Sequence, residues 1–428
     1  MRSFEWQPFS KKQLRVLSWW TKGSPVKDMD GIICDGSIRS GKTVCMAFSF
    51  VVWAMSSFDG CNFAITGKTV NSVRRNVTAD LVRMLTGEGF GVREVVSRGY
   101  IEITRGKASN RFYLFGGKDE GSAALIQGVT LAGCLFDEAA LMPRSFVEQA
   151  AARCSVKGSK LWFNCNPEGP LHWFKKDWID KAEEKRMLRL HFTMDDNLSL
   201  AASTRERYER MYTGVFYERF ILGKWSAADG LIYDMFDRSR HILHELPEMD
   251  GAAPTYVSCD YGTLNACVFL MWRRAKDGRW ICTKEYYYSG RDKGLQKTDS
   301  EYVRDMRSFI GGERPRGIIA DPSAASFIEA LRREVGSPVM HAKNDVMTGI
   351  RLVSSLLHSG DLAFMDCCVN TAGEFGSYLW DKKASEKGID IPLKQNDHAM
   401  DAVRYFCNTV LAPGRRVGTS QLRRMIGI

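Results

Sequence analysis

The sequence predicts two α/β domains in succession, the first built on a mostly parallel sheet. In residues 31–167, apolar runs of strand length end in polar or acidic residues, as parallel strands do at the carboxyl edge of a sheet. After residue 254, strand-length apolar runs that end in acids begin again, now within a meander of consecutive strands. The Pro- and Gly-marked stretch 245–254 separates the two patterns, so we place a domain boundary near residue 250.

Length and composition agree with two or three globular units. The chain has 428 residues, of which 44% are hydrophobic and 26% charged, and it contains no low-complexity stretch. Its most apolar run, 44–55, is shorter than the roughly 20 residues that span a bilayer, and residues 1–12 lack the apolar core of a signal peptide. The sequence therefore predicts a protein without membrane segments.

The net charge indicates which kinds of partner the protein binds, and the cysteines indicate the redox state of its compartment. The net charge of +10 favours acidic partners such as nucleic acid or an anionic membrane. The twelve cysteines form no CxxC pair and have no His-rich neighbour, so neither a zinc site nor a disulfide framework is predicted. Several of them lie in apolar runs, where a free cysteine behaves as a small buried hydrophobe in a reducing cytosol.

A phosphate-binding loop follows the first predicted strand. Residues 31–35 predict a buried strand and residues 44–55 a helix, with the sequence GSIRSGKT between them. Backbone N–H groups of such a loop surround phosphate oxygens, Lys42 reaches the β and γ phosphates, and the Thr43 hydroxyl ligates Mg²⁺. The predicted nucleotide-binding residues are Gly36, Ser37, Ile38, Arg39, Ser40, Gly41, Lys42 and Thr43. The alternative is a Gly-rich turn that only caps a helix.

An acidic pair ends a second apolar run. Residues 131–136 predict a buried strand, and Asp137 and Glu138 follow it at the carboxyl edge of the sheet. In this position Asp137 binds Mg²⁺ through water and Glu138 polarises the attacking water, as in phosphoryl transfer by P-loop ATPases. An acidic pair at a helix N-cap is the alternative.

Other polar residues are expected at the same edge. The run 160–167 ends in Asn164 and Asn166, either of which is a candidate sensor of the γ-phosphate, although Asn-Pro is also a turn signal. Arg39 faces phosphate charge or is a solvated loop arginine. Arg74 and Arg75 follow another strand, and they contact DNA or belong to a solvated helix face.

Acids end strands again in the second half. Residues 255–259 predict a strand that ends at Asp260, followed by apolar strands 266–272 and 280–287. Residues 316–320 predict a strand that ends at Asp321, followed by a helix over 325–334.

A third group of acids begins the last predicted helix. In residues 396–405, spacings of three and four place Asp397, His398 and Asp401 near one face. Carboxylates from two strand ends and a helix match the RNase H-like nuclease plan, in which acids hold two divalent ions about 4 Å apart. Oxygen ligands favour Mg²⁺ or Mn²⁺. Alternatively, Asp260 and Asp321 cap turns, Asp397 is an N-cap and Asp401 is solvated.

The ordered set of these motifs resembles the large terminase subunit of tailed double-stranded DNA bacteriophages. The resemblance runs through nearly the whole chain. It rests on residues 36–43, 126–133 with 136–139, 164–167, Ile221–Trp225, Asp260, Asp321 and 397–401.

The resemblance implies a fold and a function. It implies a P-loop (RecA/ASCE-like) ATPase domain over 1–190, a linker subdomain over 191–250, an RNase H-like nuclease domain over 251–412 and a basic tail over 413–428 that contacts portal or DNA. In this family ATP hydrolysis drives duplex DNA through a portal into a preformed head, and the nuclease makes the cuts that start and end packaging.

The resemblance also implies site residues, cofactors and partners. Gln13 is similar to the family's adenine-contacting glutamine; Asp260, Asp321 and Asp401 would be nuclease metal ligands, with His398 a further ligand or an orienting residue and Asp397 able to reach a metal. The implied cofactors are ATP with Mg²⁺ and, at the nuclease, two Mg²⁺ or Mn²⁺. The implied partners are double-stranded DNA, the portal and procapsid, a small terminase subunit and further copies in a pentameric ring, in the host cytoplasm.

Two rival functions are open from the sequence. One is a helicase or repair ATPase fused to a resolvase-like nuclease, which the lack of a second RecA-like core disfavours. The other is a non-catalytic assembly factor, which the intact set of Lys42, Asp137 and Glu138 disfavours. The sequence does not choose the trans-acting arginine finger among Arg74, Arg75, Arg144 and Arg153.

Overall fold

The computed structural model describes residues 6–412 and divides into two compact units. Within the described residues, the first comprises residues 6–209, Val215–Ala228 and Lys383–Ile389, and the second comprises Arg210–Gly214, Asp229–Lys382 and residues 390–412. The linker subdomain predicted over 191–250 is thus shared between the two units, and the predicted boundaries remain predictions. The basic tail predicted over 413–428 lies outside the described residues.

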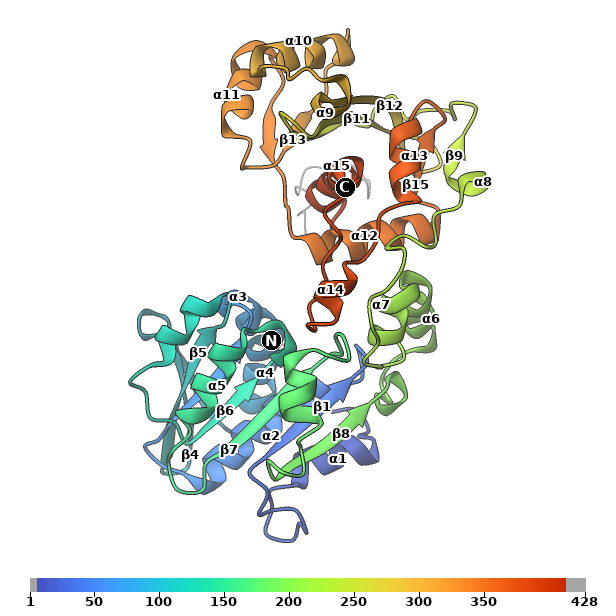
Figure 1. The fold of residues 1–428 in the computed structure, drawn as a ribbon. Helices are drawn as coiled ribbons and strands as arrows, with labels where there is room; N and C mark the ends of the chain where they lie inside the picture. Colours follow the sequence, from blue (N-terminus) through green and yellow to red (C-terminus); the bar gives the residue numbers. More distant parts are fainter. Residues whose placement is uncertain (1–5, 413–428) are drawn as a thin grey trace, which may run out of the picture. The chain divides into compact units, whose positions relative to one another are not determined.

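The first unit is built on an eight-stranded sheet in the order β3-β4-β5-β2-β6-β7-β1-β8 (Figure 1). Its strands are β1 Gly31–Gly36, β2 Asn62–Gly67, β3 Gly91–Val95, β4 Tyr100–Arg105, β5 Ala108–Gly116, β6 Gly133–Phe136, β7 Lys160–Cys165 and β8 Met187–Phe192. The six strands that are neighbours in the order β5-β2-β6-β7-β1-β8 run parallel, which confirms the predicted mostly parallel sheet. The hairpin of β3 and β4 extends one edge antiparallel and was not predicted, because β3 buries none of its side chains.

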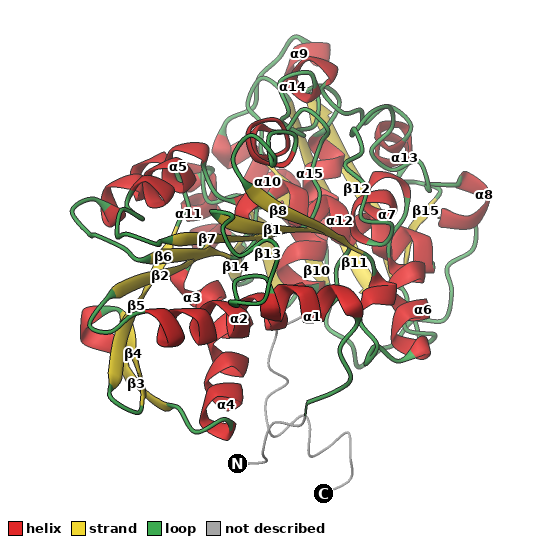
Figure 2. Cartoon of the chain, turned by 90° about the horizontal axis from the view of Figure 1, so that it is seen from below, coloured by secondary structure: helices red, strands yellow, loops and turns green. Residues whose placement is uncertain are grey.

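Helices cover both faces of this sheet (Figure 2). The helices in residues 11–220 are α1 Lys11–Ser18, α2 Lys42–Ser57, α3 Val70–Val73, α4 Ala79–Gly87, α5 Arg144–Ala152, α6 Ala202–Met211, which buries none of its residues, and α7 Gly214–Phe220. The same residues contain the π turns η1 Arg74–Thr78 and η5 Lys175–Ile179 and the 3₁₀ turns η2 Val96–Arg98, η3 Glu120–Ile126, η4 Ala139–Leu141 and η6 Met194–Asp196. Ile32 packs in the cluster with α1, α2 and α4, whereas its neighbour Ile33 packs with α5 on the opposite face. Burial on both faces explains why β1 reads as a continuous apolar run.

The second unit has a seven-stranded mixed sheet in the order β14-β13-β10-β11-β12-β15-β9. Its strands are β9 Ile242–Leu243, β10 Tyr256–Asp260, β11 Ala266–Arg274, β12 Trp280–Ser289, β13 Gly317–Ala320, β14 Val339–His341 and β15 Leu362–Met365. Strands β10, β11 and β12 form the predicted antiparallel meander, and β13 joins β10 in parallel. The two strands that end near the predicted nuclease acids are therefore neighbours.

Helices pack on both faces of the second sheet as well (Figure 1). The helices in residues 238–412 are α8 Arg238–His241, α9 Gly290–Lys293, α10 Asp299–Ile310, α11 Ala325–Glu334, α12 Val346–Ser359, α13 Val369–Phe375, α14 Lys382–Ser385 and α15 His398–Phe406, followed by the π turn η7 Cys407–Leu411. Of these, α14 lies mostly in the first unit. The buried faces of α10 and α11 pack on β10 and β11. Helix α15 packs against the same strands, where Phe406 stacks on Trp272 with ring centroids 4.3 Å apart. This packing brings the start of α15 to the end of β10.

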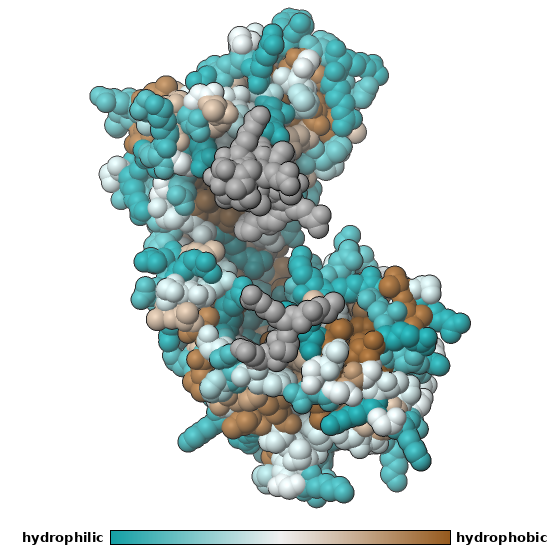
Figure 3. Space-filling view, turned by 180° about the vertical axis from the view of Figure 1, so that it is seen from behind, coloured by the Kyte–Doolittle hydropathy of each residue, from teal (hydrophilic) through white to brown (hydrophobic). Residues whose placement is uncertain are grey.

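No helix in residues 6–412 is long and apolar enough to cross a membrane. In the space-filling view of Figure 3, hydrophilic residues make up most of the visible surface, interrupted by smaller hydrophobic groups.

Candidate nucleotide and nuclease sites

The loop between β1 and α2 has a backbone that requires its glycines. Gly36 has a φ of 133°, and a Cβ there would lie 1.9 Å from the Phe192 carbonyl oxygen. Gly41 has a φ of 82°, and a Cβ there would lie 2.3 Å from Gln13 Nε2. Only glycine adopts this conformation without strain or a clash. The predicted loop is therefore formed as a tight turn at the N-terminus of α2.

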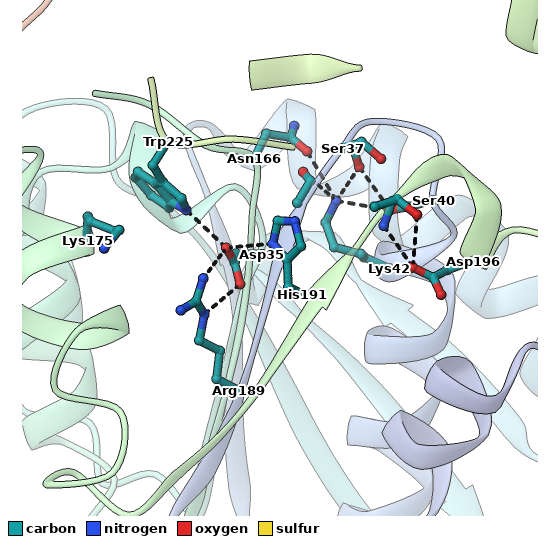
Figure 4. Close-up of polar contacts among 12 residues, drawn as sticks. Asp35, Ser37, Ser40, Lys42, Asn166, Lys175, Arg189, His191, Asp196 and Trp225 are labelled. Atoms are coloured by element: carbon teal, nitrogen blue, oxygen red, sulfur yellow. Dashed lines mark hydrogen bonds and ion pairs between the residues drawn. The ribbon is translucent and has the colours of Figure 1, made fainter. Parts of the chain in front are cut away.

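The Lys42 ammonium lies inside this loop (Figure 4). Its Nζ donates to the carbonyl oxygens of Ser37 at 2.6 Å and Gly36 at 3.1 Å, to Ser40 Oγ at 3.2 Å and to Asn166 Oδ1 at 3.3 Å. Burial lowers the pKa of Lys42 to about 8. The ammonium is thus held by neutral oxygens at the place where the N–H groups of a phosphate-binding loop converge.

The predicted Mg²⁺ ligands lie together beside Lys42. Asn164 Nδ2 donates to Asp137 Oδ1 at 2.6 Å and to Thr43 Oγ1 at 2.8 Å, so one amide joins the strand ends β6 and β7 to the first turn of α2. Burial and the charge of Glu138 raise the pKa of Asp137 to about 7. Glu138 has a left-handed φ of 56°, a strained conformation of the kind found at functional sites. The site brings a hydroxyl and two acids together, as a Mg²⁺ site in a P-loop enzyme requires.

A cavity of about 530 Å³ opens over these groups. The predicted residues that line it are Ile38, Arg39, Ser40, Gly41, Lys42, Thr43, Asp137, Glu138, Asn164 and Asn166. Gly36 and Ser37, the first two residues of the loop, do not line the cavity, and their carbonyl oxygens accept hydrogen bonds from Lys42 Nζ. Residues that sequence reasoning did not assign to the site also line it, among them Asn76, Asp80 and Asn197.

Gln13 lies at a second, smaller cavity of about 160 Å³ that shares Gly41 and Val44 with the first. Trp6 and Phe9 line the same cavity. The Gln13 Oε1 accepts the Ser10 N–H at 2.9 Å, which fixes the amide in a capping box at the start of α1. The residue predicted to contact adenine thus lies at a small, mostly apolar cavity next to the phosphate loop.

The arginines near the cavity have different partners. Arg39 is exposed at the rim, and its Nε donates to Tyr208 Oη at 2.8 Å. Arg74 pairs with Glu94 at 3.0 Å, outside the cavity, whereas Arg75 lines the cavity from the π turn η1. The structure therefore separates the two neighbouring arginines that the sequence left equivalent.

The second unit brings Asp260 and His398 into contact. Asp260 Oδ2 and His398 Nδ1 are 3.0 Å apart, at the end of β10 and the start of α15. Burial and the charge of Asp401 raise the pKa of Asp260 to about 6 even though His398 opposes the shift. The hydrogen bond to Asp260 raises the pKa of His398.

The other predicted ligands are held by cations and amides. Asp401 accepts from Arg404 Nη2 at 2.6 Å, and Lys394 Nζ lies 3.2 Å from Asp397 Oδ2 and 3.7 Å from Asp401 Oδ2. Asp321 accepts from the Ser323 N–H at 2.8 Å, an Asx turn of the kind the sequence left open. Asp397 is the N-cap residue of α15, although its side chain makes no cap hydrogen bond.

The charges of three predicted acids act on the pKa of one hydroxyl, that of Tyr405. Burial raises the pKa of Tyr405, and the charges of Asp260, Asp401 and Asp321 raise it further. Within residues 6–412, however, no three His, Cys, Asp or Glu side chains are grouped so that they hold a metal ion. The carboxylate oxygens fit the chemistry of Mg²⁺ or Mn²⁺, while Lys394 and Arg404 supply the positive charge that balances them.

Comparison with solved structures decides the family. The large terminase of a thermophilic bacteriophage is 56% identical, with 95% of this chain and 100% of that chain covered and a TM-score of 0.90. This chain belongs to the large terminase family. The same phage's terminase in complex with ADP and in complex with ATP-γ-S gives 55% identity in each case, with 94% of this chain and 100% of that chain covered and TM-scores of 0.88 and 0.87.

A family profile agrees with this result. Residues 33–240 match the profile described as terminase large subunit, T4likevirus-type, N-terminal. No curated protein matches the chain. The family and the fold class predicted from the sequence are both confirmed, whereas the roles of individual site residues stay predictions.

Sequence reasoning missed a buried carboxylate in this terminase. Asp35, the residue before the loop, is fully buried. Its carboxylate accepts hydrogen bonds from Nε and Nη2 of Arg189, both at 3.0 Å, from His191 Nδ1 at 3.1 Å and from the Trp225 indole N–H at 3.0 Å (Figure 4). Burial alone would raise the pKa of Asp35, but the hydrogen bonds from His191, Arg189 and Trp225 hold it well below its usual value. An acid within a wholly apolar strand was the available signal.

A second missed residue binds the N-terminus of α15. Glu374, on α13, accepts the N–H groups of Ala399 at 2.7 Å and Met400 at 3.2 Å, and the Tyr287 hydroxyl at 2.9 Å. Burial raises the pKa of Glu374 to about 7. Because it binds the first turn of α15, Glu374 positions the helix that carries His398 and Asp401.

Proposed function

We propose that this large terminase is a DNA-packaging motor that hydrolyses ATP to move double-stranded DNA through the portal into a procapsid. Within the same proposal, its second unit cuts concatemeric DNA as a two-metal endonuclease. The observation that carries the motor is the phosphate-loop cavity, in which Lys42, Thr43 and Asp137 converge. The terminase of the thermophilic bacteriophage, which is 55% identical, has been solved with ADP and with ATP-γ-S.

In this proposal each part of a bound nucleotide has its own set of contacts. Loop N–H groups and Lys42 bind the phosphates, and the base enters the smaller cavity beside Gln13. Thr43 and Asp137 would hold Mg²⁺, which neutralises charge on the β and γ phosphates. Glu138 orients and polarises the attacking water, and Asn166, already 3.3 Å from Lys42 Nζ, contacts the γ-phosphate.

The proposed nuclease site lies at the ends of β10 and β13 and the start of α15. Asp260, Asp321 and Asp401 would hold two Mg²⁺ or Mn²⁺, and the chemistry that such ions would supply is activation of a water and stabilisation of the leaving oxygen. Because Asp260 Oδ2 lies within hydrogen-bond distance of His398 Nδ1, this histidine orients the Asp260 carboxylate or is itself a further metal ligand. Asp397 borders the same face.

The proposed partners follow from the packaging role. They are double-stranded DNA, the portal of a procapsid, a small terminase subunit and further copies of this chain in a pentameric ring, all in the host cytoplasm. The net charge of +10 supports binding to DNA through its phosphates.

Packaging into purified proheads tests this function. With DNA and ATP present, adding the chain should render DNA resistant to external nuclease, and omitting either the chain or ATP should not. Strand separation of a forked duplex without any capsid component would instead support the helicase alternative.

Nucleotide affinity is expected to fall as pH rises through 8. The pKa of Lys42 is lowered to about 8, so the ammonium that binds phosphate is progressively lost above that pH. Each further pH unit should weaken ATP-γ-S binding by up to about tenfold, until the pKa in the complex is reached. Calorimetric titrations between about pH 7 and pH 9.5 measure this, with the always-charged Lys42→Arg as the control. Parallel pH profiles in the two proteins would contradict the assignment.

Arg75 is expected to contribute to ATP hydrolysis within its own chain. It lines the cavity, so Arg75→Ala should lower kcat by about tenfold or more, the effect of losing a charge-assisted hydrogen bond. The matched control is Arg74→Ala, which loses only the exposed pair with Glu94 and should change kcat by less than about twofold.

Mixing variants separates action in cis from action in trans. If Arg75 acts on its own nucleotide, mixtures of Arg75→Ala and Lys42→Ala chains should show no more ATPase activity than the two separately. Recovered activity in the mixture would mean that Arg75 reaches the site of a neighbouring copy.

A further inference from the structure

One segment of the first unit contacts the phosphate loop without lining the nucleotide cavity. We call residues 219–226 the clasp segment; it includes Ile221–Trp225, a motif that the sequence analysis singled out without assigning a role. The Phe220 carbonyl oxygen accepts the Ile38 N–H at 2.9 Å. The clasp segment therefore forms a backbone hydrogen bond with the loop itself.

Gly223 brings the backbone of the clasp segment directly against the loop. Its φ is 71°, and a Cβ there would lie 2.9 Å from the Ser37 backbone nitrogen and 3.3 Å from Gly36 Cα. No larger residue fits without displacing one backbone or the other. A shift of the loop toward Gly223 would therefore displace the backbone of the clasp segment.

Trp225 fixes the far side of the same loop. Its indole N–H donates to Asp35 Oδ2 at 3.0 Å, and Arg189 and His191 hold the same carboxylate (Figure 4). Asp35 directly precedes Gly36 and is fully buried. The Trp225 indole is thus hydrogen-bonded to the residue that directly precedes the loop.

Arg219 joins the clasp segment to the opposite side of the cavity. It is fully buried; its Nε and Nη2 donate to the Ser226 carbonyl oxygen at 2.9 and 2.6 Å, and its Nη1 donates to Glu168 Oε2 at 3.3 Å. Glu168 follows Asn166 by two residues, and Asn166 lies 3.3 Å from Lys42 Nζ. One segment is therefore bound both to the phosphate loop and to the loop that follows β7.

We propose that the clasp segment couples the nucleotide state of the phosphate loop to the part of the chain that enters the second unit at Asp229, with Trp225 and Asp35 as positioning residues. This inference rests on the proposed ATPase function. Coupling between sites requires a contiguous set of contacts whose arrangement the ligand alters. Bound phosphate replaces the carbonyl partners of Lys42, so the phosphate loop rearranges around it. The clasp segment contacts this same loop through Phe220 and Gly223, and it contacts the preceding residue, Asp35, through Trp225.

Trp225→Phe tests the coupling, because it keeps an aromatic ring and removes the N–H donor to Asp35, together with part of the ring surface that packs on the core. We expect at least half of the wild-type ATPase rate, and at least a threefold rise in ATP consumed per base pair packaged into proheads. The matched control is Trp20→Phe, which loses a 3.0 Å indole hydrogen bond to Ser49 on α2, away from the loop. A merely structural role of Trp225 would lower ATPase and packaging together, and an unchanged ratio would overturn the proposal.

Hydrogen exchange in the full-length wild-type chain gives a test that does not depend on a variant folding. ATP-γ-S should slow exchange severalfold at the amides of the phosphate loop and of residues 219–226, and in Trp225→Phe only the phosphate loop should respond. Protection of the loop with no change in residues 219–226 of the wild type would overturn the coupling alone. Absence of protection at the loop would refute the nucleotide site and the coupling with it.

Discussion

Lys42→Ala is expected to abolish ATP hydrolysis and DNA packaging while leaving metal-dependent cutting intact. The variant removes the ammonium that is held among the carbonyl oxygens of the phosphate loop, and with it the charge that stabilises the transferring phosphoryl group. Loss of such a preorganised charge lowers kcat by at least about 100-fold. ATP turnover, packaged DNA and nicking of plasmid with Mn²⁺ are measured on the same preparation.

Lys160→Ala is the matched control for this prediction. Lys160 lies in the same sheet and is partly buried, and its ammonium also binds backbone carbonyl oxygens, those of Lys27 at 2.8 Å and Met29. It begins β7, at the end of the strand opposite to Asn164, so its loss should affect stability and not turnover. Full ATPase activity in Lys42→Ala would refute the assignment of the phosphate loop.

Replacement of Asp321 is expected to abolish DNA cutting and to leave ATP hydrolysis unchanged. As a ligand of a catalytic metal, Asp321 would support several kcal/mol of transition-state stabilisation, so cutting should fall by about two orders of magnitude or more. Two variants distinguish this role from a turn cap. Asp321→Ala removes both functions, whereas Asp321→Asn keeps an oxygen that accepts the Ser323 N–H and loses the charge together with the oxygen that accepts from Asn344 Nδ2 at 3.0 Å.

The control for Asp321 is another Asx turn of the second unit. Asp237 Oδ1 accepts the Ser239 N–H at 2.8 Å, the same spacing and distance as in the pair of Asp321 and Ser323. Asp237→Asn should cut DNA at the wild-type rate. Undiminished cutting by Asp321→Asn would remove Asp321 from the metal site and leave it a turn residue.

The phosphate site was predictable because its determinants are local. A strand, a glycine-marked turn and a helix N-terminus place Lys42 and Thr43 whatever the rest of the chain does. Asp137 and Asn164 then follow from a general rule, that parallel strands bring their carboxyl ends to one edge. The 2.6 Å contact between these two side chains realises that rule.

The features that were missed depend on distant partners. Asp35 is stabilised by Arg189, His191 and Trp225, which lie far along the chain, and no periodicity in the sequence links these positions. The direction of Arg75 depends on the π turn η1, which has no signature in the sequence. The antiparallel hairpin of β3 and β4 was not predicted, because β3 is mostly exposed and lacks an apolar pattern.

The strand ends and the helix that carry the proposed nuclease residues were predictable, but the partners of these side chains were not. Spacing placed Asp397, His398 and Asp401 on one helix, and strand ends supplied Asp260 and Asp321. Sequence reasoning gave no signal for Arg404, which pairs with Asp401 one helical turn away, or for Glu374, which holds the helix terminus. Such pairings depend on how α13, α15 and the sheet pack together.

The most direct test of the central claim, that one chain carries separate sites for moving and for cutting DNA, is packaging of concatemeric DNA into purified proheads. Both the amount of protected DNA and the length of the cut product are measured for the wild type, Lys42→Ala and Asp321→Asn. The account predicts ATP-dependent protection with cutting for the wild type, cutting without protection for Lys42→Ala, and protection without cutting for Asp321→Asn. Loss of both readouts in either folded variant, or protection that does not require ATP, would contradict it.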